Sequence, residues 1–461
     1  MFAYFIINFI SMKKVIAIVA IVVIVAAGAA FFVVPQLVKQ NKPGLSTTKE
    51  SVTIKYISNQ ALVEQDPTDE TIARIDKIIN GFTSQTGIKV VRMVPPQAIE
   101  SYTDISKYLV GIFNSPNVDF DVTMVDGPWT GTFAPYLLDL TPYFKDRLNQ
   151  FFPDLIQNAT VNGKLVAIPF FQDMTVLFYR TDLLEKYGYH NPPKTWDELE
   201  QMAKVIQAGE RKTNRYFWGY VWAANESESL TCTALGLQAS FGGGKIIDNG
   251  KITVDNPSAL EAFTKAKSWI NTISPPNILE LSEDDALIIW LNGNAAFMQN
   301  WPVSFQNGQT EDSIIKDKFK ITSLPSGGAG NFGVYGGEYL GIDKRTAHPA
   351  EAAAFLNYLT SPAVQKRRAI EDLWSPVLPG LYQDPALAAA QPVYQFITAD
   401  LFSHGVVRPG SQAGDVYDQL STDYFTEIHA ILAGQISPAN GLKKLAKELS
   451  QLTGLPVAIN Q

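Results

Sequence analysis

The sequence predicts an α/β protein of two lobes, preceded by one N-terminal transmembrane helix. Three observations indicate this fold class. The chain has 461 residues, which is too long for one ordinary hydrophobic core. From residue 52 onward, short apolar strand patterns alternate with amphipathic helical patterns, as they do in parallel α/β sheets. A continuous apolar run occupies residues 15–34, and about 20 such residues span the hydrocarbon core of a bilayer.

The apolar run decides on which side of the membrane the protein is expected. Lys13 and Lys14 precede the run, so the positive-inside rule directs the rest of the chain outward. Two interpretations remain open for the run itself. It stays as an anchor, because it exceeds the roughly 7–15 apolar residues of a signal peptide, or the small residues around Gly28 form a cleavage site that releases the protein.

We therefore predict a signal or membrane anchor over residues 1–36, in a chain that starts at Met1 or Met12. Residues 37–51 are rich in Asn, Gly, Ser and Thr, a composition typical of a flexible linker. The expected location is the cell surface, with the bulk of the chain outside.

Composition excludes several classes of protein and site. The formal net charge is −8, whereas a nucleic-acid-binding protein needs a cationic face. Cys232 is the one cysteine, so neither an intrachain disulfide nor a lipoprotein anchor after the apolar run is expected, and we interpret it as a small buried hydrophobe. The four histidines are scattered without metal-ligand spacing, and we predict no metal and no cofactor.

The strands and helices of the outer part follow from local patterns. Alternating or β-branched segments predict strands over residues 51–57, 88–93, 118–125 and 165–171. Capping patterns predict helix starts at Asp66-Pro67 (a helix ending near Gly81), Thr195–Glu198, Ser258–Glu261, Ser361-Pro362 and Ser437-Pro438, the last opening a helix over 441–452. Gly242–Lys245 is interpreted as a turn, because it lacks the Ser or Thr of a phosphate loop. Gly327–Gly337 is interpreted as a loop beside a strand, where a ligand can approach the bare backbone.

Aromatic residues stand beside carboxylates at several predicted strand ends. Asp126 is near Trp129, Phe171 is near Asp173, and Glu338 precedes Tyr339. Sugars present hydroxyl groups, which carboxylates bind, and C–H faces, on which aromatic rings stack. Ligands of α/β sheets bind outside the carboxyl ends of the strands. The recurrence of these pairs, together with Trp301 after Asn300, predicts a sugar-binding site.

An enzyme is the alternative reading of the same carboxylates. Asp126, Asp173 and Glu338 could act as a glycosidase pair. The sequence contains no G-x-S-x-G, no H-E-x-x-H and no dinucleotide-binding fingerprint. We predict that the chain is not an enzyme, with a surface glycosidase as the alternative.

Several longer motifs resemble one family. The segment 177–198, LFYRTDLLEKYGYHNPPKTWDE, is similar to the signature of extracellular solute-binding proteins of sugar importers. The segments 209–214, 217–222, 230–232, 273–277 and 293–302 are similar to the trehalose/maltose-binding branch of these proteins. The resemblance extends over residues 52–455.

This resemblance implies a type II, periplasmic-binding-protein-like clamshell whose lobes close on a solute for an ABC permease and its ATPase subunits. It places the N-terminal lobe at residues 52–170 and 315–365, and the C-terminal lobe at residues 171–314 and 366–461. Asp126, Phe171, Asp173, Trp301 and Gly337 match positions where that branch contacts sugar.

Three departures from the branch leave the sugar open. Val303 and Glu338 stand where aromatic residues are expected, and the helix over residues 102–113 lacks an expected arginine. Maltose and trehalose head the candidates, followed by glucose and other gluco-oligosaccharides. A peptide or a polyamine is the alternative solute, but the sequence shows no strongly acidic cluster that a polyamine would need.

The complete predicted substrate-binding set is Asp126, Trp129, Phe171, Asp173, Trp222, Trp301, Gly337, Glu338, Tyr339 and Trp374. Two Asn-x-Ser/Thr acceptor sequences, at Asn158 and Asn225, predict glycosylation and agree with an extracellular location.

Overall fold

Two β-sheets organise the part of the chain that the computed structural model describes, residues 52–57, 70–93, 102–116 and 119–458. The predicted membrane segment, the linker and the start of the first helix at Asp66-Pro67 lie outside these residues. Within the described part, no helix is both long enough and apolar enough to cross a membrane.

The first sheet has the strand order β14-β13-β3-β1-β2, and β6 also pairs with β13. Its strands are β1 Thr53–Ile57, β2 Lys89–Met93, β3 Val122–Asp126, β6 Ile168–Met174, β13 Gly333–Ile342 and β14 Gly405–Val406. β1 runs parallel to β2 and β3, whereas β13 runs antiparallel to β3 and β6. Every residue of β3 is buried, Thr123 and Asp126 included, as expected for a central strand. The strands predicted from the first part of the sequence are therefore confirmed, with shifted ends.

The second sheet has the order β12-β7-β11-β8. Its strands are β7 Val176–Arg180, β8 Trp218–Val221, β11 Ala295–Asn300 and β12 Phe319–Thr322. Two small ribbons, β4 Thr160–Val161 with β5 Lys164–Leu165 and β9 Ile247–Asp248 with β10 Lys251–Ile252, lie outside both sheets.

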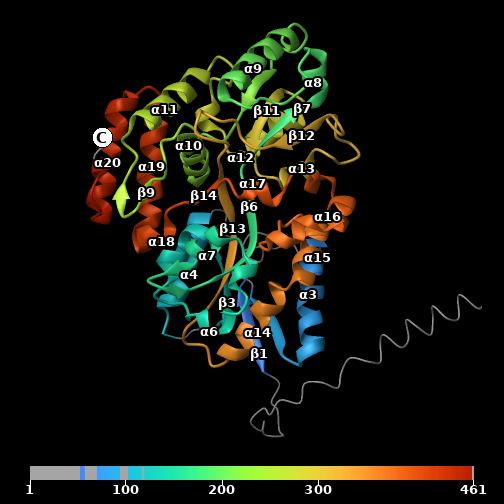
Figure 1. Ribbon diagram of the computed structural model, residues 1–461, viewed down its shortest axis with the longest axis vertical. Helices are drawn as coiled ribbons and strands as arrows, with labels where there is room; N and C mark the ends of the chain where they lie inside the picture. The colour runs from blue at the N-terminus through green and yellow to red at the C-terminus, as the bar shows by residue number, and fades with distance from the viewer. Residues whose placement is uncertain (1–51, 58–69, 94–101, 117–118, 459–461) are drawn as a thin grey trace, which may run out of the picture. The chain divides into compact units, whose positions relative to one another are not determined.

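Helices cover both sheets (Figure 1). Those that contact the first sheet or pack beside it are α3 Glu70–Thr86, α4 Tyr102–Asn114, α5 Thr130–Phe133, α6 Thr141–Phe144, α7 Pro153–Asn158, α14 Pro349–Leu359, α15 Pro362–Asp372, α16 Pro385–Ala390, α17 Ala399–Phe402 and α18 Gly410–Ala413. Those around the second sheet are α8 Thr181–Lys186, α9 Trp196–Glu210, α10 Glu228–Ser240, α11 Pro257–Trp269, α12 Glu283–Leu291, α13 Ser304–Asn307, α19 Tyr417–Leu432 and α20 Pro438–Thr453. Of these, α10 also contacts β13 and β14 of the first sheet.

Three of the predicted helix caps are confirmed. Thr195, Ser361 and Ser437 each accept a hydrogen bond from a backbone N–H three residues ahead, at the starts of α9, α15 and α20. The cap predicted at Ser258 is wrong, because α11 starts two residues earlier. There the Asn256 side chain accepts from the Ala259 N–H at 2.9 Å, and Pro257 occupies the first turn.

The chain passes between the two sheets at identifiable points. It leaves β6 at Met174 and enters β7 at Val176, and it returns between β12 and β13. The expected lobe boundaries shift accordingly. β12 pairs with β7 of the second sheet, so the returning segment starts after Thr322 rather than at residue 315. The boundary at 365 would cut α15, which runs to Asp372 and packs on α3.

Candidate functional site

Strand β13 brings together residues that are far apart in the sequence. On one side, Glu338 is paired with Asp126 at the end of β3. On the other side, Glu338 also pairs with Phe171 of β6, and Gly336 pairs with Asp173. The register of one strand therefore gathers the carboxylates and the aromatic ring that the sequence predicted separately.

Two glycines of β13 are required by close contacts. A Cβ at Gly337, whose φ is +88°, would lie 2.3 Å from the Phe171 carbonyl oxygen. A Cβ at Gly336 would lie 2.7 Å from the Trp301 ring. Only glycine allows this backbone conformation and this approach of the indole.

The second sheet contributes Trp301, directly after β11. Its indole Nε1–H donates to Glu283 Oε1 at 2.6 Å, and its backbone N–H donates to Asn300 Oδ1 at 2.8 Å. Asn300 in turn donates to the Glu283 carbonyl oxygen at 3.0 Å. The end of β11 and the start of α12 therefore hold the indole in one orientation.

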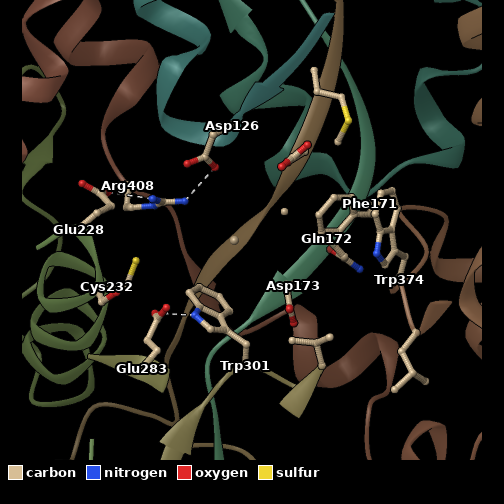
Figure 2. Close-up of a pocket in the computed structure, with 17 residues that line it drawn as sticks. Asp126, Phe171, Gln172, Asp173, Glu228, Cys232, Glu283, Trp301, Trp374 and Arg408 are labelled. Carbon is tan, nitrogen blue, oxygen red and sulfur yellow. Dashed lines mark hydrogen bonds and ion pairs between the residues drawn. The ribbon is translucent and has the colours of Figure 1, made fainter. Parts of the chain in front are cut away.

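These residues surround a cavity of about 370 Å³ (Figure 2), within the range of roughly 300–1,000 Å³ that is typical of small-molecule sites. Its wall comes from strands β3, β6 and β13 of the first sheet, from helices α10 and α12, and from the segments that follow β11, α15 and β14. The lining residues are Met124, Asp126, Phe171, Gln172, Asp173, Glu228, Ser229, Cys232, Glu283, Trp301, Val303, Gly336, Gly337, Glu338, Leu373, Trp374 and Arg408.

Aromatic rings lie on two sides of the cavity. Figure 2 shows Trp301 on one side, and Phe171 with Trp374 on the other. The Phe171 and Trp374 ring centroids are 4.3 Å apart, with an angle of 32° between the ring planes. A flat ligand with apolar faces fits between such rings.

Five carboxyl groups and one guanidinium supply the ionisable part of the wall, beside the polar side chains of Gln172 and Ser229. Arg408 donates to Asp126 Oδ1 at 3.2 Å and to Glu228 Oε1 at 2.8 Å. Burial raises the pKa of Asp126, although the neighbouring Arg408 lowers it. Burial also raises the pKa of Glu283. The sequence showed no acidic cluster, but the fold assembles one in this cavity, so a polyamine stays a candidate solute.

Asp173 is held by a backbone hydrogen bond. It accepts a 2.9 Å hydrogen bond from the Met174 N–H, and no lysine or arginine of the described residues forms an ion pair with it. Burial, with a smaller contribution from the Glu283 charge, raises the pKa of Asp173 to about 8. This carboxyl is therefore largely protonated at neutral pH, so it can donate a hydrogen bond as well as accept one.

Replacing Asp173 by asparagine is expected to make the protein more stable than the parent at pH 8, to stabilise it by a smaller margin at pH 5, and to leave the two about equally stable below about pH 4. Because the folded pKa is raised, unfolding releases a proton between about pH 4 and pH 8, and the parent loses stability as the pH rises through this interval. The asparagine side chain cannot ionise, so the variant avoids that loss. With screening by solvent in the cavity, we expect a difference of about 1–2 kcal/mol between the two pH values. Urea unfolding at both pH values measures it, and a difference that does not change with pH would contradict this prediction.

Seven of the ten predicted substrate-binding residues lie in the cavity wall: Asp126, Phe171, Asp173, Trp301, Gly337, Glu338 and Trp374. The other three are corrected, because they belong to the buried core. Trp129 packs on Phe133, and Trp222 donates to Ser274 and stacks on Tyr220. Tyr339 is 2% exposed, and its hydroxyl accepts a hydrogen bond from Asn158.

The sequence reasoning missed Arg408, Glu228 and Glu283. Arg408 stands alone in a short segment between β14 and α18 and has no local pattern. A local pattern marks the position of the two glutamates. Glu228 and Glu283 are each the first residue of a helix, directly after the N-cap residues Ser227 and Ser282. The guanidinium of the cavity wall therefore comes from residue 408 and not from the helix over residues 102–113.

The glycosylation prediction at Asn158 is also corrected. This side chain is 6% exposed and donates to the Gly127 carbonyl oxygen at 2.9 Å, so it cannot carry a glycan in the folded protein. Asn225 is partly buried, and its glycosylation stays a prediction. Among the described residues, no group of three or more His, Cys, Asp or Glu side chains could hold a metal ion.

Comparison with known proteins places this chain in a family. Residues 63–366 match the family model described as bacterial extracellular solute-binding protein. A relative from Deinococcus radiodurans, named a probable ABC transporter-binding protein, is 41% identical over 73% of this chain and 80% of its own length. The maltodextrin-binding protein MdxE of Bacillus subtilis is 27% identical over 50% of this chain and 53% of its own.

Solved structures agree on the two-lobed α/β fold. The maltose-bound MalE3 of T. maritima matches with a TM-score of 0.74 and 32% identity, over 87% of this chain and 100% of that one. A solute-binding protein from Thermotoga lettingae, bound with α-D-tagatose, matches with a TM-score of 0.72 and 25% identity, over 88% of this chain and 100% of that one. The glycosidase alternative is therefore set aside, and the chain belongs to the bacterial extracellular solute-binding proteins, the receptors of ABC transporters that bind a solute without acting as enzymes.

Proposed function

We propose that this receptor captures a di- or oligosaccharide of the maltose type between its two lobes and delivers it to the permease of an ABC importer. The observation that carries the proposal is the cavity wall, in which Trp301 lies opposite the Phe171–Trp374 pair, with Asp173 between them and further carboxyl groups around the cavity. Rings bind the C–H faces of a sugar, and carboxylates and Arg408 bind its hydroxyl groups. The sugar ligands named for MalE3 and MdxE support the same class, and trehalose remains a second candidate sugar.

A cationic solute such as a polyamine is the second candidate function. The wall holds five carboxyl groups against one guanidinium, which is paired with two of them, and the Asp173 carboxyl is largely neutral at pH 7. The ammonium group of a bound polyamine would be attracted to the carboxylates that are not paired with Arg408. The aromatic rings do not separate the two candidates, because they also attract cations.

A ligand panel on the purified full chain separates the candidates. Maltose, trehalose, glucose and spermidine are added separately while the melting temperature is recorded, and the sugars are then checked for conversion to products. A ligand at a hundredfold excess over its Kd stabilises the folded state by about 2.7 kcal/mol. We expect maltose to stabilise the protein and to remain unchanged. Stabilisation by spermidine without any sugar response would support the second candidate and overturn the first.

We also propose that residues 15–34 tether the receptor to the outer face of the membrane, as their length and the preceding lysines indicate. Protease added to intact cells is expected to remove the part of the chain beyond residue 51. Protection of that part until the cells are lysed would contradict the outward orientation.

A further inference from the structure

A buried arginine lies behind one aromatic wall of the cavity. Arg368, on α15, is 3% exposed, and its Cζ lies 3.6 Å from the centroid of the Trp374 ring. Phe171 lies 4.3 Å from the same ring, centroid to centroid. Two groups this close to one ring occupy its two faces. Guanidinium, indole and phenyl ring therefore form a continuous stack that ends at the cavity.

The end of α15 holds this stack in place. Arg368 Nε lies 2.5 Å from Asp372 Oδ2, and Arg74 on α3 donates to the other carboxylate oxygen at 2.5 Å. Leu373 then ends the helix with a φ of +56°, a left-handed conformation that costs free energy in a non-glycine residue. This turn places Trp374 directly after the anchored helix end and beside the cavity.

Burying this guanidinium costs free energy unless its charge is paired and its N–H donors are hydrogen-bonded. Its Nη2 has no hydrogen-bond partner in the part of the chain that the structure describes, and a buried cation with an unsatisfied donor is costly. An aliphatic side chain could fill the same volume without that cost. Two contacts offset this cost: the buried ion pair with Asp372 and the cation–π interaction with Trp374, which is strongest in desolvated surroundings.

We propose that Arg368 is a positioning residue for ligand binding, which fixes Trp374, and through it Phe171, as a rigid wall for the face of a sugar ring. This inference rests on the proposed function, since a rigid aromatic wall matters only to a ligand that stacks on it. A wall that is already rigid loses less side-chain conformational entropy when the ligand binds.

The first test measures the Trp374 side chain without any ligand. Its own fluorescence is obtained as the difference between each full-length protein and its Trp374→Phe counterpart, with acrylamide as the quencher. Arg368→Met is expected to raise the quenching of Trp374 by about twofold, since the ring loses its cation–π partner. Arg367→Met is the matched control: Arg367 is the neighbouring residue, and its ion pair is with Glu371 instead. The control is expected to leave the quenching unchanged.

The second test measures binding of maltose by titration calorimetry. Arg368→Met is expected to weaken binding by about tenfold, whereas Arg368→Lys, which keeps the charge but not the planar fork, is expected to recover part of this loss. In a Trp374→Ala background, Arg368→Met should have no further effect, because the residue acts through the indole.

The outcomes distinguish this inference from the proposed function. If no sugar binds, the proposed function fails, and the fluorescence test still decides whether Arg368 fixes Trp374. Unchanged quenching in folded Arg368→Met, or equal loss of affinity with and without Trp374, overturns the inference. If Arg368→Met does not fold, Asp372→Asn releases the guanidinium from its anchor and should change the quenching in the same direction. If neither of these variants nor Arg368→Lys folds, Arg368 is a core residue and the inference is wrong.

Discussion

Arg408→Met is expected to lower the free energy of unfolding by about 3 kcal/mol at pH 7, since breaking a buried ion pair costs roughly 3–5 kcal/mol. Arg408 is 6% exposed and pairs with Asp126, which is equally buried. Without the guanidinium, the Asp126 carboxylate remains in the wall with no opposite charge. The lower end of the range applies because Glu228, the other partner, is 27% exposed at its side chain and keeps hydrogen bonds from Tyr417 and Ser421.

Two comparisons identify the cause of this loss. Adding Asp126→Asn to Arg408→Met should restore part of the stability, because it removes the unpaired carboxylate. Lowering the pH to 5 should also reduce the loss of stability that Arg408→Met causes. Burial already raises the pKa of Asp126, and loss of Arg408 raises it further, so the carboxyl of the variant takes up a proton more readily than in the parent.

Urea unfolding curves measure these differences. Arg367→Met serves as the control, because its partner Glu371 lies one helical turn away and both side chains are about one-third exposed. Such a surface pair contributes about 0–1 kcal/mol. A loss for Arg408→Met no larger than that of the control would show that the buried network does not stabilise the fold.

Local interactions explain which parts of the fold the sequence predicted. The caps at Thr195, Ser361 and Ser437 depend on a side chain and a backbone N–H only three residues apart, so a short pattern contains all the information. Ser258 matched the same pattern, but Asn256 followed by Pro257 is a stronger helix start two residues upstream. Competition between neighbouring caps decided that position.

The candidate site was predicted where one strand end carries both a ring and a carboxylate, as Phe171 and Asp173 do. The same reasoning failed for Tyr339, because successive side chains of a strand point to opposite faces. Glu338 faces the cavity, so Tyr339 enters the core. Arg408 and Asp126 are 282 residues apart, and no local pattern can show a contact that only the folded chain makes.

Trp301→Ala is expected to cause the largest loss of ligand affinity of any single substitution in the cavity. The indole lies against Gly336 and is oriented by its hydrogen bond to Glu283. Stacking of rings contributes about 0.5–1.5 kcal/mol beyond area burial, and burial adds about 25 cal/mol per Å². Val303, the nearby rim residue, is 49% exposed and provides no ring, so no second platform on this side replaces the lost one.

We therefore expect Trp301→Ala to weaken maltose binding by about 2–4 kcal/mol, which is roughly thirtyfold to a thousandfold. Trp301→Phe keeps a ring but loses the hydrogen bond to Glu283, and should fall between the parent and the alanine variant. Asp173→Asn should have a smaller effect than Trp301→Ala, because the parent carboxyl, with a pKa of about 8, is already largely neutral at pH 7. Titration calorimetry gives the affinities, and an unfolding curve for each variant shows that folded protein is compared. If well-folded Trp301→Ala binds maltose as tightly as the parent does, stacking on this indole does not hold the sugar.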